Sequence, residues 1–172
     1  MKSKKWLIIG LGRHGKDTAA EYLRDKHGYN FTSMYAAQKF IYNSLKDVLN
    51  YQSFDECYED RHNWRELWYQ LIKAYNHEQG SRIASEMITD GYDMYVGMRD
   101  DRELADCKDK GLFDVIVWVD AEERLGVTES KRSCKVTKDD AQVIIYNNDS
   151  LEELYSQLDI LVKTVESGSI KK

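Results

Sequence analysis

The chain has 172 residues, of which 42% are hydrophobic and 32% charged, and its formal net charge is -5 at pH 7. This length fits one domain with a full core, and the apolar runs are too short to cross a membrane. The negative charge argues against a general nucleic-acid binder, since such proteins carry a basic surface that neutralises backbone phosphates. The sequence therefore predicts a single globular domain over residues 1–172, without a nucleic-acid or membrane partner.

The chain contains three cysteines, Cys57, Cys107 and Cys134. They are odd in number, widely spaced and free of any CxxC pair, so neither a disulfide framework nor a zinc site is indicated. This use of cysteine is typical of reduced thiols and predicts a cytoplasmic protein. The oligomeric state stays open, with a homodimer as one option.

Apolar runs of strand length predict five strands. They cover residues 6–9, 29–32, 94–98, 114–119 and 143–146. Between them, apolar residues recur at helical spacing. The predicted helices cover residues 16–27, 37–49, 64–75, 79–90, the segment around Leu104, and 151–165. This alternation predicts an α/β fold in three layers, with a mainly parallel five-stranded sheet between two layers of helices.

Residues 10–18 read Gly-Leu-Gly-Arg-His-Gly-Lys-Asp-Thr and follow an apolar strand directly. A phosphate-binding loop needs glycines that let backbone N–H groups turn inward, a lysine that reaches the phosphates, and a helix N-terminus behind it. The alternative is a glycine-rich turn with an incidental lysine, but the flanking strand and helix favour phosphate binding. The predicted ATP-binding residues of this loop are Gly10, Gly12, Arg13, His14, Gly15, Lys16, Asp17 and Thr18.

The position after the lysine departs from the usual pattern. A serine or threonine hydroxyl normally binds magnesium there, whereas this chain has Asp17 followed by Thr18. A carboxylate is also a suitable oxygen ligand, so we expect Asp17 to bind Mg²⁺ directly or through water, with Thr18 as the alternative ligand. His14 lies within the loop, where a solvent-facing position is expected rather than a role as acid or base.

Together with later segments, the Gly-Lys-Asp-Thr element resembles the phage-type deoxynucleoside monophosphate kinases, a branch of the P-loop nucleoside monophosphate kinases. The resemblance implies the P-loop kinase fold, ATP and Mg²⁺ as cofactors, and a phage protein that works in the host cytoplasm. The segments that carry it are residues 15–18, 60–65 with Trp68, 95–99 with 102–104, 113–120 and 141–154.

The resemblance also assigns residues to the acceptor and to a lid. Arg61, Arg65 and Arg99 would hold the acceptor monophosphate, within and after a helical region of about residues 34–90. Guanidinium suits this task because its planar fork holds phosphate oxygens bidentately. As an alternative, Arg61 and Arg65 pair with nearby acids on a solvated face.

A polar stretch of about residues 120–136 resembles the mobile lid of these kinases. Its Arg124 and Arg132 would join Lys16 and Arg99 as catalytic cations, with Lys131 nearby. The alternative is an ordinary solvated loop.

Asn147 and Asn148 resemble the segment that meets the donor adenine in these kinases. Equally, the asparagines make a turn and Asp149 or Ser150 caps the last helix.

One further departure concerns the metal. Many P-loop kinases have an acid at the end of the third strand, where this chain has Gly97, which leaves Mg²⁺ to Asp17, Thr18 or Asp100. The predicted function is ATP-dependent phosphorylation of (deoxy)nucleoside monophosphates to diphosphates. The alternatives are a kinase for another small phosphorylated acceptor and a catalytically weak nucleotide-binding sensor, which Gly97 favours.

Overall fold

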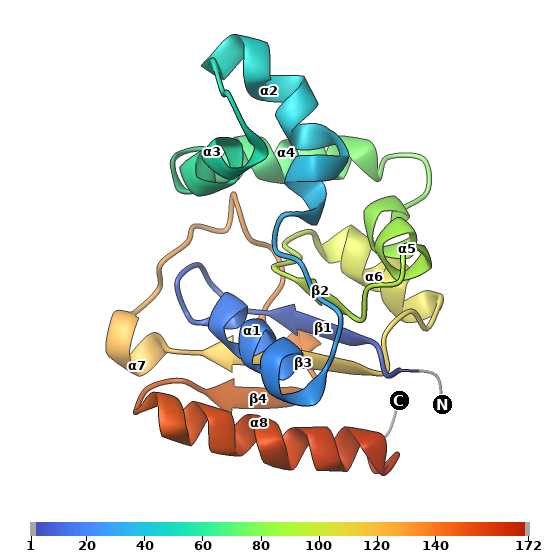
Figure 1. Cartoon of the computed structure of the whole chain (residues 1–172), viewed down its shortest axis with the longest axis vertical. Coiled ribbons are helices and arrows are strands. Elements are labelled where there is room, and N and C mark those ends of the chain that lie inside the picture. The colour runs from blue at the N-terminus through green and yellow to red at the C-terminus, as the bar shows by residue number, and fades with distance from the viewer. Residues whose placement is uncertain (1–2, 171–172) are drawn as a thin grey trace.

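A parallel β-sheet with helices on both faces forms the centre of the computed structural model, which describes residues 3–170 (Figure 1). Its strands are β1 (Trp6–Ile9), β2 (Met94–Val96), β3 (Val115–Asp120) and β4 (Val143–Tyr146), in the spatial order β2-β1-β3-β4. Every pair is parallel, and Ile8 lies level with Val96 and Val117. Every residue of β1 and β3 is buried, as expected for central strands covered on both faces.

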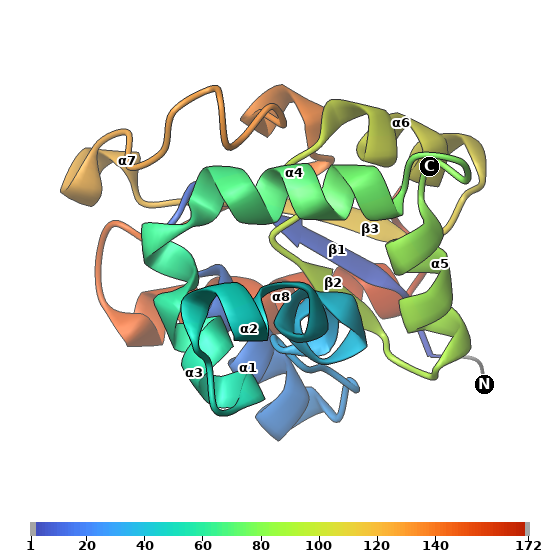
Figure 2. The ribbon, with the colours of Figure 1, turned by 90° about the horizontal axis from the view of Figure 1, so that it is seen from above.

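The helices form two layers on the sheet and a third group beside it. They are α1 (Lys16–His27), α2 (Tyr42–Leu49), α3 (Phe54–Glu59), α4 (Arg65–Tyr75), α5 (Arg82–Thr89), α6 (Asp101–Asp109), α7 (Glu122–Leu125) and α8 (Leu151–Glu166). Figure 1 shows α2, α3 and α4 grouped on one side of the sheet, and in the view from above α4 runs across the strands (Figure 2). Within residues 3–170, no helix is long and apolar enough to cross a membrane.

Each face of the sheet has its own core. Leu23 of α1 and Leu154 and Leu158 of α8 pack on one face, whereas Ile83 of α5 and Leu104 of α6 pack on the other. The helical group has a third, smaller core.

That third core contains Ile41 and Leu45 with Cys57, and Leu71 of α4 packs against it. Helix α4 belongs to this helical group and also reaches the sheet. Its side chains therefore lie between the helical group and the sheet.

The prediction of five strands is wrong, because the sheet has four and residues 29–32 form no strand. Tyr29 and Phe31 are buried, which explains the alternation that suggested a strand. However, the backbone of Asn30 pairs with Asp93, whose backbone N–H donates to the Asn30 carbonyl (2.8 Å) while its carboxylate accepts from the Asn30 N–H (2.8 Å). The side chain of Asp93 thus takes the place of a second ladder bond, and the segment passes the edge of β2 without joining it.

The helix predicted at residues 16–27 has those bounds, and the other predicted helices are present with shifted ends, except that residues 37–49 begin as a π-helix (Ala37–Ile41) before α2. Trp64 precedes α4, and the Asn63 amide donates to Asp60 (2.6 Å). At the last helix, Ser150 is the N-cap, and its hydroxyl accepts from the Glu153 N–H (3.2 Å). The three cysteines are free and buried.

Candidate functional site

The glycine-rich segment forms a loop between β1 and α1, and Lys16 is the first residue of that helix. Gly15 has a φ of 99°, and a Cβ atom there would lie 2.3 Å from the Asn147 amide nitrogen. A side chain at position 15 would therefore be both strained and blocked. The Gly12 N–H of this loop donates to the Glu129 carboxylate (2.8 Å), and Lys16 begins α1, so the loop lies at the positive end of that helix.

Lys16 is buried at this point, and its Nζ donates to the Leu11 carbonyl (2.7 Å). Burial lowers the pKa of Lys16 to about 8, and the charge of Arg99 lowers it as well, although Glu129 and Asp17 oppose the shift. Burial, more than the neighbouring charges, therefore makes the charged ammonium group costly. An arriving anion would stabilise its charged form.

A cleft opens in front of the loop and contains about 1050 Å³ of empty space, part of which is open to solvent. Its walls come from the loop, α4, the residues after β2 and the start of α6. Lys16, Arg61, Arg65 and Arg99 line its basic part, and Tyr95 and Glu103 line its inner part. The structure therefore brings together the cradle lysine and all three arginines that the sequence assigned to the acceptor.

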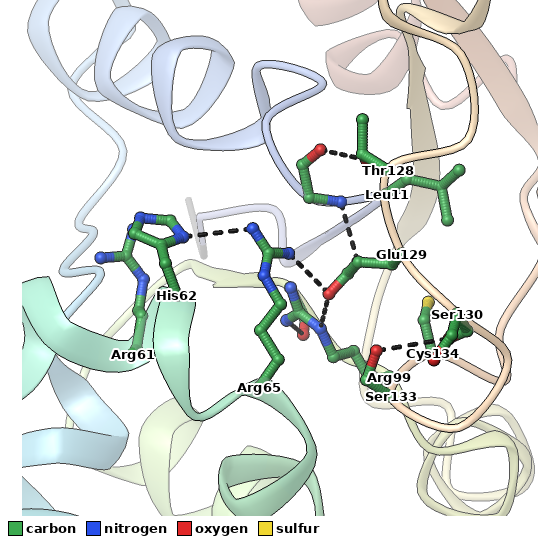
Figure 3. Close-up of polar contacts among 12 residues, drawn as sticks. Leu11, Arg61, His62, Arg65, Arg99, Thr128, Glu129, Ser130, Ser133 and Cys134 are labelled. Carbon is green, nitrogen blue, oxygen red and sulfur yellow. Dashed lines mark hydrogen bonds and ion pairs between the residues drawn. The ribbon is translucent and has the colours of Figure 1, made fainter.

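The carboxylate of Glu129 is bound by two of the arginines that line the cleft (Figure 3). One oxygen accepts from Arg65 (2.8 Å) and Arg99 (3.0 Å), and the other accepts from the Gly12 N–H (2.8 Å). The side chain has no exposed surface. Burial alone would raise the pKa of Glu129, but Arg99, Arg65 and Lys16 outweigh it and lower the pKa. An oxyanion is therefore held by two guanidinium groups and a loop N–H.

Glu129 was not predicted as a site residue, because only the cations of residues 120–136 were taken as candidates for phosphate binding. A signal was present, since Glu129 is the one acidic residue between Arg124 and Lys138. A single carboxylate in a basic stretch that folds over other cations is a candidate partner for them.

The segment around Glu129 is anchored to the loop at several points. The Thr128 hydroxyl donates to the Gly12 carbonyl. His14 Nδ1 accepts from the Ala121 N–H (3.1 Å), and its Nε2 lies 2.9 Å from the Gly126 carbonyl. The ring is thus a neutral imidazole that carries its proton on Nε2. The expectation that His14 faces solvent is wrong: only 1% of the residue is exposed, because both ring nitrogens bond the backbone of the lid.

Arg61 lies over the Tyr58 ring at 3.7 Å and donates to the Tyr58 carbonyl (2.8 Å). Its guanidinium is 3.6 Å from the Asp17 carboxylate. Arg61 and Arg65 thus pair with Asp17 and Glu129 inside the cleft, not with acids of their own helical segment on a solvated face.

The lid cations and the adenine candidates lie outside the cleft in this structure. Arg124 and Arg132 are exposed, and Arg124 Nε donates to the Asn147 carbonyl (3.3 Å). A catalytic role for both arginines would need the lid to move, and it stays a prediction.

Asn147 is buried, and its amide donates to the His14 carbonyl (3.0 Å), which holds the loop in place. Asn148 accepts weakly from the Arg124 N–H (3.4 Å). Arg13, in the loop itself, is exposed. Contact of the two asparagines with adenine likewise stays a prediction.

Asp17 and Thr18 lie at the start of α1, where a metal bound to the donor phosphates would be expected. Within residues 3–170, no group of three or more histidine, cysteine, aspartate or glutamate residues is arranged to hold a metal. Mg²⁺ commonly needs only one or two protein oxygens, because phosphates and waters supply the others. The half-exposed Asp17 carboxylate and the Thr18 hydroxyl fit that donor set.

Gly97 and Asp100 do not add to this donor set. Gly97 has a φ of 85°, and a Cβ atom there would lie 3.2 Å from Arg99, whose guanidinium donates to the Gly97 carbonyl (2.8 Å). An acidic side chain at position 97 would therefore displace Arg99. Asp100 is already engaged, since its carboxylate accepts from the Tyr69 hydroxyl (2.9 Å) and caps α6.

No family model matches this chain, and no curated protein sequence matches it.

Proposed function

We propose that this protein transfers a phosphoryl group from ATP to a (deoxy)nucleoside monophosphate. The observation that carries the proposal is the binding of the Glu129 carboxylate by Arg65, Arg99 and the Gly12 N–H, beside Lys16. A phosphate group asks for the same donors and carries more negative charge, so it would bind this site more strongly.

The cleft supplies donors for two phosphates rather than one. The loop of residues 10–18 and the start of α1 would hold the donor triphosphate, with Lys16 on its terminal phosphates. The three arginines stand opposite, on α4, on the turn before it and after β2, and would hold the acceptor phosphate. Phosphoryl transfer depends on in-line positioning and charge neutralisation more than on covalent chemistry, so a ring of cations suits it.

Magnesium bound at Asp17 and Thr18 together with the phosphates would neutralise charge on the donor. The protein groups do the remaining work. Lys16 and Arg99 orient and stabilise the phosphoryl oxygens, and the Thr128–Glu129 segment covers the site. Glu129 must leave the arginines when phosphate enters, and its return after the reaction would help to expel product.

A parallel sheet with helices on both faces and a glycine-rich loop after its first strand supports the P-loop kinase fold as part of the proposal. In such sheets ligands bind beyond the carboxyl ends of the strands, where Gly10 follows β1 and Arg99 follows β2. The resemblance to phage-type deoxynucleoside monophosphate kinases points to the same class of acceptor.

The test is to incubate purified protein with ATP, Mg²⁺ and each nucleoside or deoxynucleoside monophosphate in turn, measuring the ADP and nucleoside diphosphate formed. We expect stoichiometric formation of both products with at least one acceptor, and none with a Lys16→Met variant. Lys163→Met, on the exposed surface of α8, is the matched control. Transfer to no nucleotide would overturn the proposal.

A nucleotide sensor is the second candidate, and Gly97 is the observation that favours it. In that case ATP would bind with Lys16-dependent affinity, but no acceptor would be phosphorylated. Calorimetry with ATP alone, set beside the transfer assay, separates the sensor from the kinase.

A further inference from the structure

Glu103 is a buried acid in the cleft whose carboxyl group has no hydrogen-bond partner. The residue lies near the start of α6, is 1% exposed and lines the inner part of the cleft. Both of its carboxyl oxygens lack a hydrogen bond. Buried polar atoms are nearly always satisfied in folded proteins, so two unsatisfied oxygens on a residue that lines a cleft indicate a missing partner.

The surroundings of Glu103 keep it neutral. Burial raises the pKa of Glu103 to about 8, and the charge of Asp100 adds to the rise. The polar side chains of Tyr95 and Asn76 lie close enough to offset it in part, although neither meets the geometry of a hydrogen bond to the carboxyl group. The other titratable group close by is Cys107, one turn further along α6, whose own pKa is raised by burial. At neutral pH the carboxyl group is therefore mainly protonated, and it presents one O–H donor beside one acceptor oxygen.

Unsatisfied polar atoms are concentrated around this part of the molecule. Among residues 3–170, the buried side-chain atoms without a partner belong to Trp6, Trp68, Asn76 and Glu103. Trp68 lines the cleft, and Asn76 lies next to Glu103. The Asn76 carbonyl oxygen is fixed by the Ile83 N–H (2.9 Å), which leaves its amide N–H groups for the carboxyl side.

The other walls of the inner cleft are apolar or aromatic. They include Tyr69 and Ile72 of α4, Met87 of α5 and Tyr95 of β2. Such walls suit a flat ring that is apolar on its faces and polar at its edge, whereas a sugar phosphate would leave them unused. The phosphate-binding arginines lie in the same cleft, so one ligand can reach both ends.

We propose that neutral Glu103 is the residue that reads the base of the acceptor, by pairing its O–H and its carbonyl oxygen with a ring edge that carries an acceptor and a donor side by side. The inference rests on the proposed function and narrows it, since the acceptor must then be a nucleotide with a lactam-type or amidine-type edge. Asn76 lies beside the carboxyl group, and its amide nitrogen is likewise without a partner.

Two alternative roles for Glu103 predict different experimental outcomes. An ionised carboxylate would offer two acceptors, as needed for the paired N1–H and N2–H₂ donors of guanine, and binding would then release a proton. A purely structural buried acid would affect stability but not the choice of acceptor.

The experiment compares wild type with Glu103→Gln and Glu103→Met, using the acceptor that gives the fastest transfer. Glutamine also presents a donor beside an acceptor, so we expect Glu103→Gln to keep the acceptor KM within about threefold of wild type at pH 7. Methionine has a similar volume without these groups, and Glu103→Met should raise the acceptor KM by about tenfold, with the ATP KM unchanged. The control is Asp109→Asn, on the exposed side of α6.

The pH profile separates the neutral acid from the carboxylate. As Glu103 ionises above pH 8, the acceptor KM of wild type should rise by up to tenfold per pH unit. Glu103→Gln should lack this additional rise in its acceptor KM. Titration of Lys16 or of the substrate phosphate is common to both proteins and cancels in the comparison. A KM that falls as pH rises, together with a loss in Glu103→Gln, would overturn the proposal in favour of the ionised carboxylate.

The remaining outcomes are also decisive. If wild type transfers phosphate but both Glu103 variants keep its acceptor KM and its order of preference among bases, the base reading fails while the kinase stands. If wild type phosphorylates no nucleotide, both proposals fail together.

Discussion

Two buried acids, Glu103 in the cleft and Glu129 behind its arginines, are held in opposite ways. Glu129 is ionised, and each of its oxygens has partners among Arg65, Arg99 and the loop backbone. Glu103 has no hydrogen-bond partner, and burial holds it mainly neutral. Both carboxyl groups are nearly inaccessible, so burial alone does not decide their state.

The difference indicates which kind of chemical group the surroundings of each acid favour. A cluster of cations keeps a carboxylate charged and exchanges it readily for another oxyanion. An apolar pocket removes the charge and leaves a donor beside an acceptor, which suits an uncharged polar edge. We therefore expect recognition of an anion beside Glu129 and recognition of an uncharged polar edge beside Glu103.

The largest effect should come from removing the cradle lysine. Lys16→Met should reduce transfer by at least about a thousandfold, because the ammonium group stabilises charge that develops on the phosphates. The variant should nevertheless be more stable without ligand. At pH 7 the buried ammonium is costly, since its pKa is lowered to about 8, so the free energy of unfolding should rise by about 1 kcal/mol or more. Steady-state kinetics and urea titration measure the two effects, and a variant that is active would break the phosphate assignment.

Arg99 should distinguish acceptor from donor. Arg99→Ala should raise the acceptor KM by about 10–100-fold with the ATP KM within about threefold, because the guanidinium lies after β2 on the acceptor side. Arg102→Ala, one turn away and exposed, is the matched control. Equal losses for ATP and acceptor would mean that Arg99 serves the transferring phosphate alone.

Glu129 should compete with phosphate for the arginines. Glu129→Gln should bind the acceptor monophosphate or inorganic phosphate about tenfold more tightly, because a neutral amide is easier to displace from Arg65 and Arg99. The free variant should also lose about 1–3 kcal/mol of stability, since Arg65 and Arg99 no longer have an anionic partner. Calorimetry and thermal unfolding of this variant and of Glu123→Gln, an exposed control on α7, test both effects. Weaker anion binding in Glu129→Gln would show that Glu129 supports the ligand instead.

Glu103 should give stability a pH dependence of its own. The folded protein holds this proton up to about pH 8, whereas the unfolded chain releases it near the ordinary value of 4.5. Between those values the folded state binds more protons, so the free energy of unfolding should fall with rising pH by up to about 1.4 kcal/mol per unit. Urea midpoints from pH 5 to 8 should show a shallower decline in Glu103→Gln. Identical slopes would mean that Glu103 is ionised in the folded protein.

The local pattern of the sequence was enough for most elements and for the phosphate loop. A helix such as α8 is encoded by the spacing of its own apolar residues, and its Ser150 cap lies within three residues of its partner. The loop of residues 10–18 is likewise local, since its glycines and lysine act on one turn of backbone. The strand predicted at residues 29–32 failed because strand formation needs a distant partner, and Asp93 supplied a side chain there instead of a ladder.

Which residues share a cleft was decided only by the tertiary structure. Gly12 and Glu129 are bonded across a sequence separation of 117 residues, and His14 meets Ala121 across 107. The spacing of residues in the sequence does not predict such pairs, because they form only when α4, β2 and residues 120–136 pack around the loop. The pKa of Glu103 is of the same kind, since its neutral state comes from the walls that surround it rather than from its neighbours in the chain. The sequence by itself determined the helices, the strands of an α/β sheet and a glycine-rich loop, and the fold alone decided which acids meet the arginines and which acid stays uncharged.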